Sequence, residues 1–410
     1  KPWPWRIPRS SIKVLKSLME DLGIRQPAGA TATNASEALA VAAKVGFPLL
    51  ARPSFVLGGR AMKILYGVPE LETYMRETVH PTPEHPILLD HYLENATEVD
   101  VDCIRDTHGT AIVAGIMQHI EEAGIHSGDS ACVIPSITLS ESVLRVLREQ
   151  TVRIAHALEV VGMMNIQYAV KDNVVYVLEV NPRASRTVPF VAKATGVPFA
   201  KLATKVMLGR SLAELGYTEE VVPKHYSVKE SVFPFSKFHG SDTVLGPEMK
   251  STGEVMGIDA TFGAAFAKSQ VGASSKLPLK GTVFVSVNDR DKAGVVDIAR
   301  RIAKMGMKLV ATSGTADYLK KAGIEVEIVK KVSEGPGNIV ELLLEKKIAL
   351  LINTPMGSNA KGDDAVIRQA ALRAAVPYTT TLSAASAAAE AIATLRSSDL
   401  GVKCLQDWYS

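Results

Sequence analysis

The stretch Leu178-Glu-Val-Asn-Pro-Arg-Ala-Ser-Arg-Thr187, which a hydrophobic run enters, constrains this chain more than any other segment. Residues 174–180 have the character of a buried strand. Because side chains alternate along a strand, Glu179 and Asn181 should point the same way, with Arg183 just beyond them. Two oxygen donors and a guanidinium at one strand end are the groups that a Mg-nucleotide site needs. Taken alone, a solvated strand end with a turn at Asn-Pro explains the segment equally well.

The composition is that of an ordinary globular chain with two or three domains. The chain has 410 residues, of which 47% are hydrophobic and 22% are charged. A net charge of +3 is too small and too dispersed to favour nucleic acid or a membrane, and no apolar run approaches the length of a membrane span. Three widely spaced cysteines predict a reducing compartment, the cytoplasm, with an organelle as the alternative. Because the chain begins with Lys1, we expect a fragment or a processed product.

Two patterns of secondary structure divide the chain. Residues 1–275 mix helices and strands without regular alternation, which favours an α+β fold, whereas residues 276–410 alternate regularly and predict a small doubly wound parallel sheet. Gly272, the serines at 274 and 275, and Pro278 indicate a linker between the two parts. Strands are expected at 48–52, 60–66, 87–89, 97–104, 111–117, 168–171, 174–180, 281–287, 308–311, 325–330, 348–352 and 378–380. Helices are expected at 11–22, 36–45 with Ser36 as N-cap, 140–158, 199–208, 292–304, 316–321, 339–345, 365–375 and 384–395.

A glycine-containing segment, Arg52-Pro-Ser-Phe-Val-Leu-Gly-Gly-Arg60, joins two of these strands. Adjacent glycines let backbone amides approach an anion, and Arg52 at a strand end can hold a phosphate oxygen. The Walker pattern is absent, so the segment is interpreted as a hairpin-type phosphate flap. An ordinary glycine hairpin turn is the alternative.

Other polar groups follow strands or lie in loops. Glu98, which follows the apolar strand at 87–89, can hold ribose hydroxyls, and the loop 121–130 contains His126 and Ser127, interpreted as positioning groups. If the strand of Gln167 pairs with that of Glu179 as a hairpin, both residues and Asn181 converge on one cation. Each segment alone also fits a solvated loop or a satisfied structural histidine.

In the second part, polar side chains come after the predicted strands, at the edge where open parallel sheets bind ligands. The turn Thr312-Ser-Gly-Thr315 opens a helix, and its amides and hydroxyls suit a phosphate. No activated nucleophile accompanies these groups, so a binding site is favoured over a catalytic one, with ordinary helix capping as the alternative. The candidate residues are Lys292, Thr312, Thr315, Lys331 and Asn353.

Taken together, these motifs resemble the large chain of carbamoyl phosphate synthetase. The resemblance covers nearly all of residues 20–396 and is carried by the stretches 52–62, 124–131, 178–190 and 246–256. The first part is similar to the ATP-grasp module of that family, and the second part to its methylglyoxal-synthase-like regulatory domain. This order is that of the C-terminal half of the large chain, although the small α/β domain that precedes the module in the family is absent from this sequence.

The resemblance assigns roles to individual positions. It implies that Arg52 and Arg183 are catalytic and that Mg²⁺ or Mn²⁺ is held by Gln167, Glu179 and Asn181, with K⁺ as a further cation. It implies ATP binding by Arg52, Gly58, Gly59, His91, Leu93, Glu98, Gly124, Ile125, His126, Ser127, Gln167 and Glu179. It implies a phosphorylated effector, such as a nucleotide monophosphate, at the five candidates of the second part. An ornithine site, present in some members, would use Glu121, Asp129, Glu230 and Thr380.

The implied activity is the phosphorylation of carbamate by a second ATP, which yields carbamoyl phosphate for pyrimidine and arginine biosynthesis. The implied partners are the N-terminal half of the large chain and a glutaminase small subunit, in an oligomeric enzyme. Two alternatives stay open. One is a different ATP-grasp ligase, such as a biotin carboxylase or an amino-acid ligase, and the other is a catalytically inactive regulatory fragment.

Overall fold

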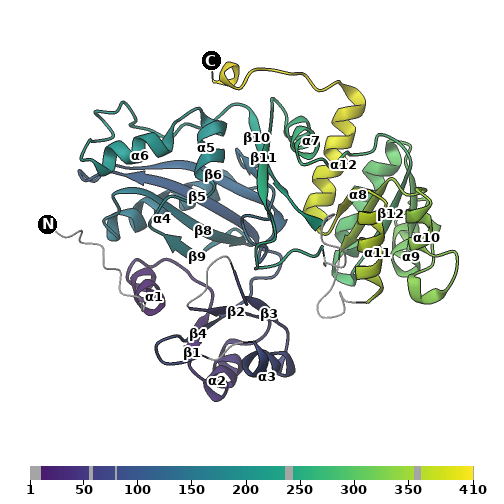
Figure 1. Ribbon diagram of the computed structural model, residues 1–410, viewed down its shortest axis with the longest axis horizontal. Helices are drawn as coiled ribbons and strands as arrows, with labels where there is room; N and C mark the ends of the chain where they lie inside the picture. Colours follow the sequence, from purple (N-terminus) through teal and green to yellow (C-terminus); the bar gives the residue numbers. More distant parts are fainter. Residues whose placement is uncertain (1–10, 55–58, 79–80, 236–242, 355–361, 410) are drawn as a thin grey trace.

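The computed structural model describes residues 11–54, 59–78, 81–235, 243–354 and 362–409. It contains three sheets that lie in separate parts of the molecule (Figure 1). A four-stranded sheet near the N-terminus lies below a central seven-stranded sheet, and a five-stranded sheet lies to one side. Within the described ranges, no helix is both long enough and apolar enough to cross a bilayer.

The N-terminal sheet has the strand order β1-β4-β2-β3, and all its neighbours are antiparallel. Apolar side chains from two helices, including Ala38 and Tyr74, form one buried cluster with the sheet. The first of these two helices, α2, begins at Ala35 with Asn34 as N-cap, so the predicted N-cap at Ser36 is wrong by two residues. The elements are α1 (Ser11–Asp21), β1 (Gly29–Ala32), α2 (Ala35–Val45), β2 (Leu49–Pro53), β3 (Lys63–Leu65), α3 (Val68–Glu77) and β4 (Ile87–His91).

The central sheet has the strand order β11-β10-β7-β6-β5-β8-β9, again with antiparallel neighbours. One apolar cluster packs part of the sheet against α1 and α4, and another packs it against α5 and α6. The strands are β5 (Thr97–Arg105), β6 (Ala111–Glu122), β7 (Cys132–Ile134), β8 (Gly162–Lys171), β9 (Val174–Asn181), β10 (Tyr226–Val232) and β11 (Gly253–Asp259). The helices are α4 (Glu141–Ala157), α5 (Val188–Thr195), α6 (Phe199–Met207) and α7 (Phe262–Gly272).

The third sheet is wholly parallel, with the order β14-β13-β12-β15-β16, which confirms the predicted doubly wound fold. Short 3₁₀ turns η2 (Asp289–Asp291) and η3 (Val332–Glu334) follow two of its strands. The strands are β12 (Thr282–Val287), β13 (Lys308–Ala311), β14 (Glu327–Ile328), β15 (Leu350–Thr354) and β16 (Tyr378–Thr379). The helices are α8 (Lys292–Lys304), α9 (Ser313–Lys321), α10 (Ile339–Leu344), α11 (Asp363–Arg373) and α12 (Leu382–Ser397).

The two parts of the chain share one hydrophobic core. Buried side chains of α7, such as Ala265 and Phe266, lie in the same cluster as Val283 of β12 and Ala388 of α12. The segment predicted as a linker therefore begins inside a packed helix, because α7 continues to Gly272. The boundary predicted between residues 275 and 276 stays a prediction.

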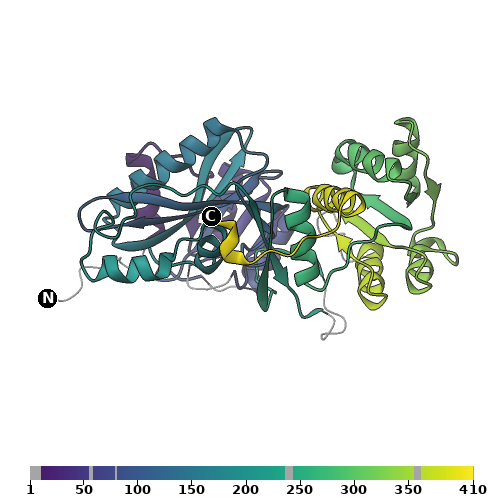
Figure 2. The ribbon, with the colours of Figure 1, turned by 90° about the horizontal axis from the view of Figure 1, so that it is seen from above.

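The C-terminal segment returns from the third sheet to the central part of the molecule (Figure 2). The Trp408 ring lies 5.4 Å from the His225 ring, and Tyr409 packs on Gly196 and hydrogen-bonds to the Lys193 carbonyl. Lys403 adds a cation–π contact, with its Nζ 4.5 Å from the centre of the Trp408 ring. The two parts are thus joined by the shared core and by the contacts of the C-terminal segment, in addition to the continuous chain.

Gly257 of β11 lets α7 approach the central sheet. A Cβ there would lie 2.0 Å from the Ala265 carbonyl oxygen and 2.4 Å from the Ser269 nitrogen. We expect Gly257→Ala to lower the free energy of unfolding by at least about 2 kcal/mol, because the helix backbone must move away. Urea denaturation measures the change. Gly253→Ala on the same strand is the control, since nothing lies within 4 Å of its Cβ position; equal losses in both variants would contradict the expectation.

Candidate functional site

Polar residues of three neighbouring strands line up across the central sheet. Asp100 of β5 pairs with Gln167 of β8, which pairs with Glu179 of β9. Directly opposed residues in antiparallel strands project from the same face, so these side chains lie side by side. The next row is formed by Asp102, Asn165 and Asn181. The predicted hairpin of Gln167 and Glu179 is therefore confirmed.

A β-bulge at Leu178 decides which face Glu179 occupies. Tyr168 pairs with Val177 and Gln167 pairs with Glu179, so Leu178 is the extra residue on β9. Val175 and Val177 face the apolar cluster beneath α4, and without the bulge simple alternation would send Glu179 to that same face. Leu178 instead packs with Ala169 on the polar side of the sheet.

Arg52 joins the N-terminal sheet to this row. Its Nη2 donates to Asp90 Oδ2 at 2.6 Å, and both terminal nitrogens lie 3.4 Å from the Leu178 carbonyl oxygen. Lys16 also pairs with Asp90, at 2.9 Å. The Arg52 Nε is buried and has no partner among the described residues, so the predicted phosphate ligand keeps a donor available.

A small apolar cluster lies where the two sheets meet. Buried alanines 96, 123 and 169 pack with Leu93 and Leu178. Nearby, at the end of β4, the Nδ1 of His91 is buried without a partner in the described structure. An apolar wall beside an unpaired polar atom suits a planar heterocycle such as adenine, for which His91 and Leu93 are the predicted contacts.

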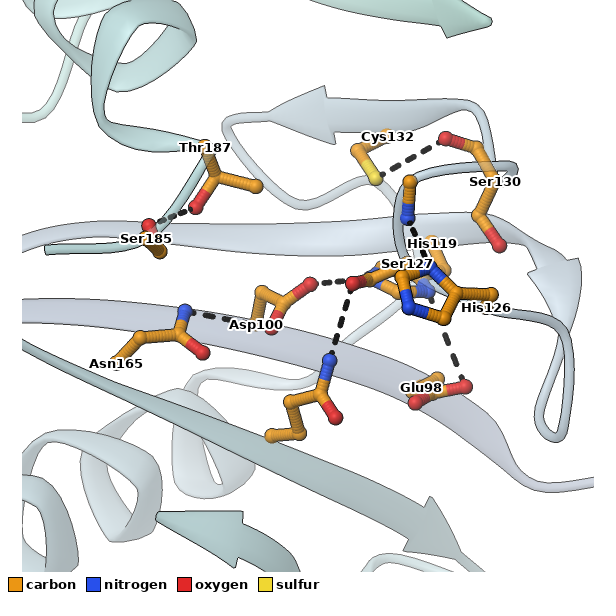
Figure 3. Close-up of polar contacts among 12 residues, drawn as sticks. Glu98, Asp100, His119, His126, Ser127, Ser130, Cys132, Asn165, Ser185 and Thr187 are labelled. Carbon is orange, nitrogen blue, oxygen red and sulfur yellow. Dashed lines mark hydrogen bonds and ion pairs between the residues drawn. The ribbon is translucent and has the colours of Figure 1, made fainter. Parts of the chain in front are cut away.

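The loop after β6 lies over the polar face (Figure 3). Its Gly124 has φ 93° and lies against the Tyr92 ring, where a Cβ would be 2.7 Å from the nearest ring atom. The Ser127 hydroxyl accepts from Gln167 Nε2 at 3.1 Å. Buried Lys229 of β10 donates to the Ser127 carbonyl at 3.0 Å. Of the predicted residues in this loop, Gly124 is thus held by the Tyr92 ring, and Ser127 by Gln167 and Lys229.

His126 stabilises this loop as a neutral ring. Its Nδ1 accepts from the Gly128 amide at 3.0 Å, and its own amide donates to the Gly246 carbonyl at 2.8 Å. Burial lowers the pKa of His126, and the nearby Arg186 lowers it further. These contacts agree with the predicted positioning role and give no indication of a proton-transfer role.

Glu98 is the predicted ribose ligand, and the structure buries it at 6% exposure. Its carboxylate accepts from the Gly124 amide at 3.3 Å and lies 3.9 Å from His119 Nδ1. Burial raises the pKa of Glu98 to about 7. The ribose role stays a prediction, and the contacts seen here anchor the loop of Gly124.

The glycine flap is only partly described. Gly58 lies outside the described residues. Gly59 has φ 71°, and a Cβ on it would lie 1.8 Å from the Pro247 carbonyl oxygen. The end of the flap therefore lies against Pro247 and Glu248, which belong to the stretch 246–256 of the family resemblance.

The donor set on β8 and β9 fits a hard divalent cation. Glu179 supplies a carboxylate, and Gln167 and Asn181 supply amide oxygens, the ligand type that Mg²⁺ and Mn²⁺ prefer. Arg183 donates to Asn181 Oδ1 at 3.1 Å, so the predicted catalytic guanidinium lies beside this set. In the described part of the chain, no three His, Cys, Asp or Glu side chains form a metal-binding group, so amide ligands and water would have to complete the site.

Sequence reasoning missed several buried polar residues beneath the loop. Asp100 Oδ2 lies 2.9 Å from His119 Nε2, and Lys229 is only 1% exposed. Asp102 accepts from Asn165, Ser185 and Thr187. The alternation Glu98-Val-Asp-Val-Asp102 within an otherwise apolar strand is a signal that could have revealed the two aspartates.

In the third sheet, the predicted effector residues gather at the carboxyl edge of the strands. Thr312 lies 3.2 Å from Ser286, Thr315 bonds to the Val287 backbone, and Asn353 donates to the Ser286 carbonyl. Lys292 pairs with Asp289 at 2.6 Å, and its Nζ would be 3.3 Å from a Cβ on Gly314. Lys331, at the start of η3, adds positive charge near Asp289.

The four predicted ornithine residues are only partly brought together. Glu121 hydrogen-bonds to Thr381 at 3.1 Å rather than to the predicted Thr380, and Glu230 accepts from Gln270 at 2.6 Å. Burial raises the pKa of Glu121 to about 7, and burial together with Glu121 raises that of Glu230 to about 8. Asp129 instead accepts the backbone amides of Lys250 and Ser251, each at 2.8 Å.

A cavity of about 760 Å³ lies between the central sheet and the third sheet beside Glu121. Carboxylates of Glu122, Asp291 and Glu390 line it together with the Arg290 guanidinium. Arg290 also pairs with Glu94, close to the predicted adenine contact Leu93. Arg290 of the second domain therefore contacts the loop between β4 and β5, which contains the predicted adenine contact Leu93.

Comparisons with known proteins agree with this geometry. The profile of the carbamoyl-phosphate synthase L chain ATP-binding domain matches residues 13–215, and that of the MGS-like domain matches residues 294–380. The Campylobacter jejuni biotin carboxylase–β-γ-ATP complex superposes with a TM-score of 0.52 at 17% identity, covering 64% of this chain and 65% of that one. The biotin carboxylase domain of Hydrogenobacter thermophilus 2-oxoglutarate carboxylase, with MgADP and bicarbonate, gives 0.52 at 18% identity, covering 63% of each chain.

The fold and site therefore define an ATP-grasp protein with a second, parallel-sheet domain. The large chain of carbamoyl phosphate synthase from Nostoc sp. is 52% identical over 398 residues, which is 96% of this chain and 36% of that protein. The chain belongs to the carbamoyl phosphate synthase large-chain family of ATP-grasp ligases. It spans about a third of the length of its curated relatives.

The half-buried pair of glutamates, Glu121 and Glu230, makes stability depend on pH. Glu230 has a pKa of about 8 in the folded chain against an ordinary value of 4.5, so folding retains a proton that the unfolded chain releases. Stability should therefore fall as pH rises from about 4.5 to 8. Glu230→Gln keeps the hydrogen bond to Gln270 but cannot titrate, so the fall in stability should be smaller in this variant. We expect a difference of about 1–2 kcal/mol, which is less than the full pKa shift implies, because solvent partly screens the side chain.

Urea denaturation at pH 5, 7 and 9 measures this effect. Glu345→Gln, at an exposed glutamate whose side chain is 54% accessible, is the matched control and should leave the pH profile unchanged. An identical fall in wild type and Glu230→Gln would contradict the expectation.

Proposed function

We propose that this chain phosphorylates carbamate with ATP to give carbamoyl phosphate, the second ATP-dependent step of a glutamine-hydrolysing carbamoyl phosphate synthetase. The observation that carries the proposal is the bulged β8–β9 hairpin, which aligns Gln167 and Glu179 opposite Arg52. The family membership and the second domain favour this step over that of other ATP-grasp ligases. The N-terminal half of the large chain and a glutaminase subunit would supply carbamate.

In the proposed reaction, a carbamate oxygen attacks the γ-phosphorus of ATP. A bond forms between that oxygen and phosphorus, the bond from phosphorus to the β–γ bridging oxygen breaks, and ADP leaves with the electron pair. Arg52 and Arg183 would balance the negative charge on the phosphoryl oxygens. Gln167, Glu179 and Asn181 would hold Mg²⁺ or Mn²⁺, which weakens the repulsion between ATP and carbamate.

Exclusion of water is the other requirement, because carbamate is labile and ATP must not be hydrolysed. The contact of Gly59 with Pro247 supports a flap that covers the nucleotide, and Lys229 and Ser127 support a rigid floor beneath it. Neither group needs to exchange a proton with the substrate. The chemistry assigned to this chain is therefore orientation and charge balance.

The reverse reaction tests the proposal with this chain alone. Incubated with MgADP and carbamoyl phosphate, the wild type should form ATP, detectable with luciferase, and Glu179→Ala should reduce the rate at least about 100-fold through loss of a metal ligand. Glu77→Ala, at an exposed glutamate of α3, is the control. No ATP from the wild type, or full activity in Glu179→Ala, would overturn the proposal; absence of any heat on titrating MgATP would favour an inactive regulatory fragment.

For the third sheet, we propose a site for a phosphorylated effector at Lys292, Thr312, Thr315, Lys331 and Asn353. The helix that follows Thr312 supplies backbone amides at its N-terminus, and the two lysines supply positive charge. The pair of half-buried acids, Glu121 and Glu230, supports a second site for a cationic effector such as ornithine.

Calorimetry tests the phosphate site. Lys331→Ala should weaken the binding of a nucleoside monophosphate about fivefold or more, because one phosphate-facing charge is lost. Lys347→Ala removes a lysine whose side chain is 64% exposed and serves as the control. Equal affinities for wild type and Lys331→Ala would exclude the lysine from the site.

A further inference from the structure

The buried carboxylate of Asp102 is the centre of a hydrogen-bond cluster that the proposed reaction does not use directly. Asp102 is fully buried on β5, one row from the Gln167–Glu179 pair. Asn165 Nδ2 donates to it at 3.0 Å and Thr187 Oγ1 at 2.8 Å, while Ser185 Oγ donates to both oxygens at 2.8 and 3.1 Å. Both carboxylate oxygens are therefore occupied by donors from the protein.

Two of these donors belong to the loop that carries the arginines. Residues 182–187 connect the end of β9 to α5, and Ser185 and Thr187 lie on either side of Arg186. Figure 3 shows the contact between their hydroxyls, whose oxygens lie 2.6 Å apart. Both hydroxyls donate to Asp102. The exposed Arg183, two residues before Ser185, hydrogen-bonds within the described structure to its chain neighbours Asn181 and Ala184. The position of its backbone relative to the sheet therefore depends on how the loop is held.

Asp102 also connects this loop to the metal-ligand strand. Asn165, which donates to Asp102, pairs with Asn181 across β8 and β9 and contacts Asp100 at 3.3 Å. One buried anion thus fixes the loop against the strand that bears Gln167. A charged acceptor makes shorter and stronger hydrogen bonds than a neutral one, so it limits the movement of the loop more tightly.

Burying this charge is costly. No lysine or arginine pairs with Asp102 in the described structure, and burial raises the pKa of Asp102 to about 6. A neutral side chain would be cheaper for folding alone. A buried anion that orders a loop beside a phosphate site is what a preorganised phosphoryl-transfer site requires.

We propose that Asp102 is a positioning residue for phosphoryl transfer, which holds Ser185 and Thr187 and thereby sets the position of Arg183 beside the metal-ligand strand. This inference rests on the proposed function, because it assigns Arg183 to the transferred phosphoryl group.

Asp106 offers a matched control at the end of the same strand. It is also fully buried, and it accepts three backbone amides, from His108, Thr110 and Leu212, at 2.8–2.9 Å. Its contacts anchor a turn and the start of a distant segment, not the arginine loop. Asp102→Asn and Asp106→Asn therefore make the same chemical change at two fully buried positions. They differ in the segments that donate hydrogen bonds to the aspartate.

Two measurements on the wild type and both variants do not depend on turnover. Amide hydrogen exchange in residues 183–187 should be about tenfold faster in Asp102→Asn and unchanged in Asp106→Asn. Calorimetry should show that the preference for the analogue AMP-PNP over ADP, each with Mg²⁺, falls about fivefold or more in Asp102→Asn only, because the loop contacts the γ-phosphate and not the adenosine.

Turnover gives the third measurement. For ATP formation from MgADP and carbamoyl phosphate, kcat should fall roughly 10- to 100-fold in Asp102→Asn with KM for ADP within about twofold. Ser185→Ala should move kcat in the same direction, and Ser185→Thr, which keeps the hydroxyl, should recover most of it. If Asp102→Asn does not fold, the comparison of Ser185→Ala with Ser185→Thr tests the inference in its place.

The outcomes separate the inference from the proposed function. Unchanged loop exchange in Asp102→Asn, or equal losses of AMP-PNP preference in both aspartate variants, overturns the positioning role. A wild type that forms no ATP but shows the loop-exchange and nucleotide-preference differences overturns the proposed reaction and leaves the positioning of a γ-phosphate-binding loop standing. A wild type without any preference for AMP-PNP overturns both.

Discussion

The register of three antiparallel strands, β5, β8 and β9, is the constraint on which the site depends. A shift of one residue would exchange the polar and apolar faces of a strand. Asp100, Gln167 and Glu179 would then point into the core beneath α4, and Val101, Ile166 and Val180 would face the predicted nucleotide site. The apolar cluster that buries Val99, Val101 and Ile166 therefore also determines where the predicted metal ligands lie. The packing of apolar side chains on one face of the sheet thus fixes the positions of the polar side chains on the other face.

Buried acids are the cost of this arrangement. Glu98, Asp100 and Asp102 occupy one strand at 6% exposure or less, and His119 and Lys229 can bring positive charge near them. Burial raises the pKa values of Glu98 and Asp102. Such perturbed groups gather at functional sites, because folding alone would favour apolar residues there. The cluster on β5 thus marks the site independently of the motifs that carry the family resemblance.

The second domain is joined to the first by packing and by charge. Helices α7 and α12 lie in one hydrophobic core, so the two domains have no solvent layer between them at this point. Arg290, close to the predicted effector residue Lys292, pairs with Glu94 beside the apolar pocket, and Glu121 bonds to Thr381 at the start of α12. These contacts reach Glu94, next to the predicted nucleotide contact Leu93, and Glu121, three residues before the predicted contact Gly124.

The sequence by itself determined the secondary structure of the longest elements, the parallel second domain and the positions of the family motifs, because periodicity and motif spacing are local properties. It also led to the β8–β9 hairpin, since Gln167 and Glu179 are close in the chain. It could not show the bulge at Leu178, the anchoring of the arginine loop by Asp102 or the different hydrogen-bond partners of Asp129 and Glu230. These features depend on which strands are neighbours and on what packs against them, and β5, β8 and α5 come from distant parts of the chain. Only the tertiary structure decided them, because burial and hydrogen-bond partners exist only once those segments meet.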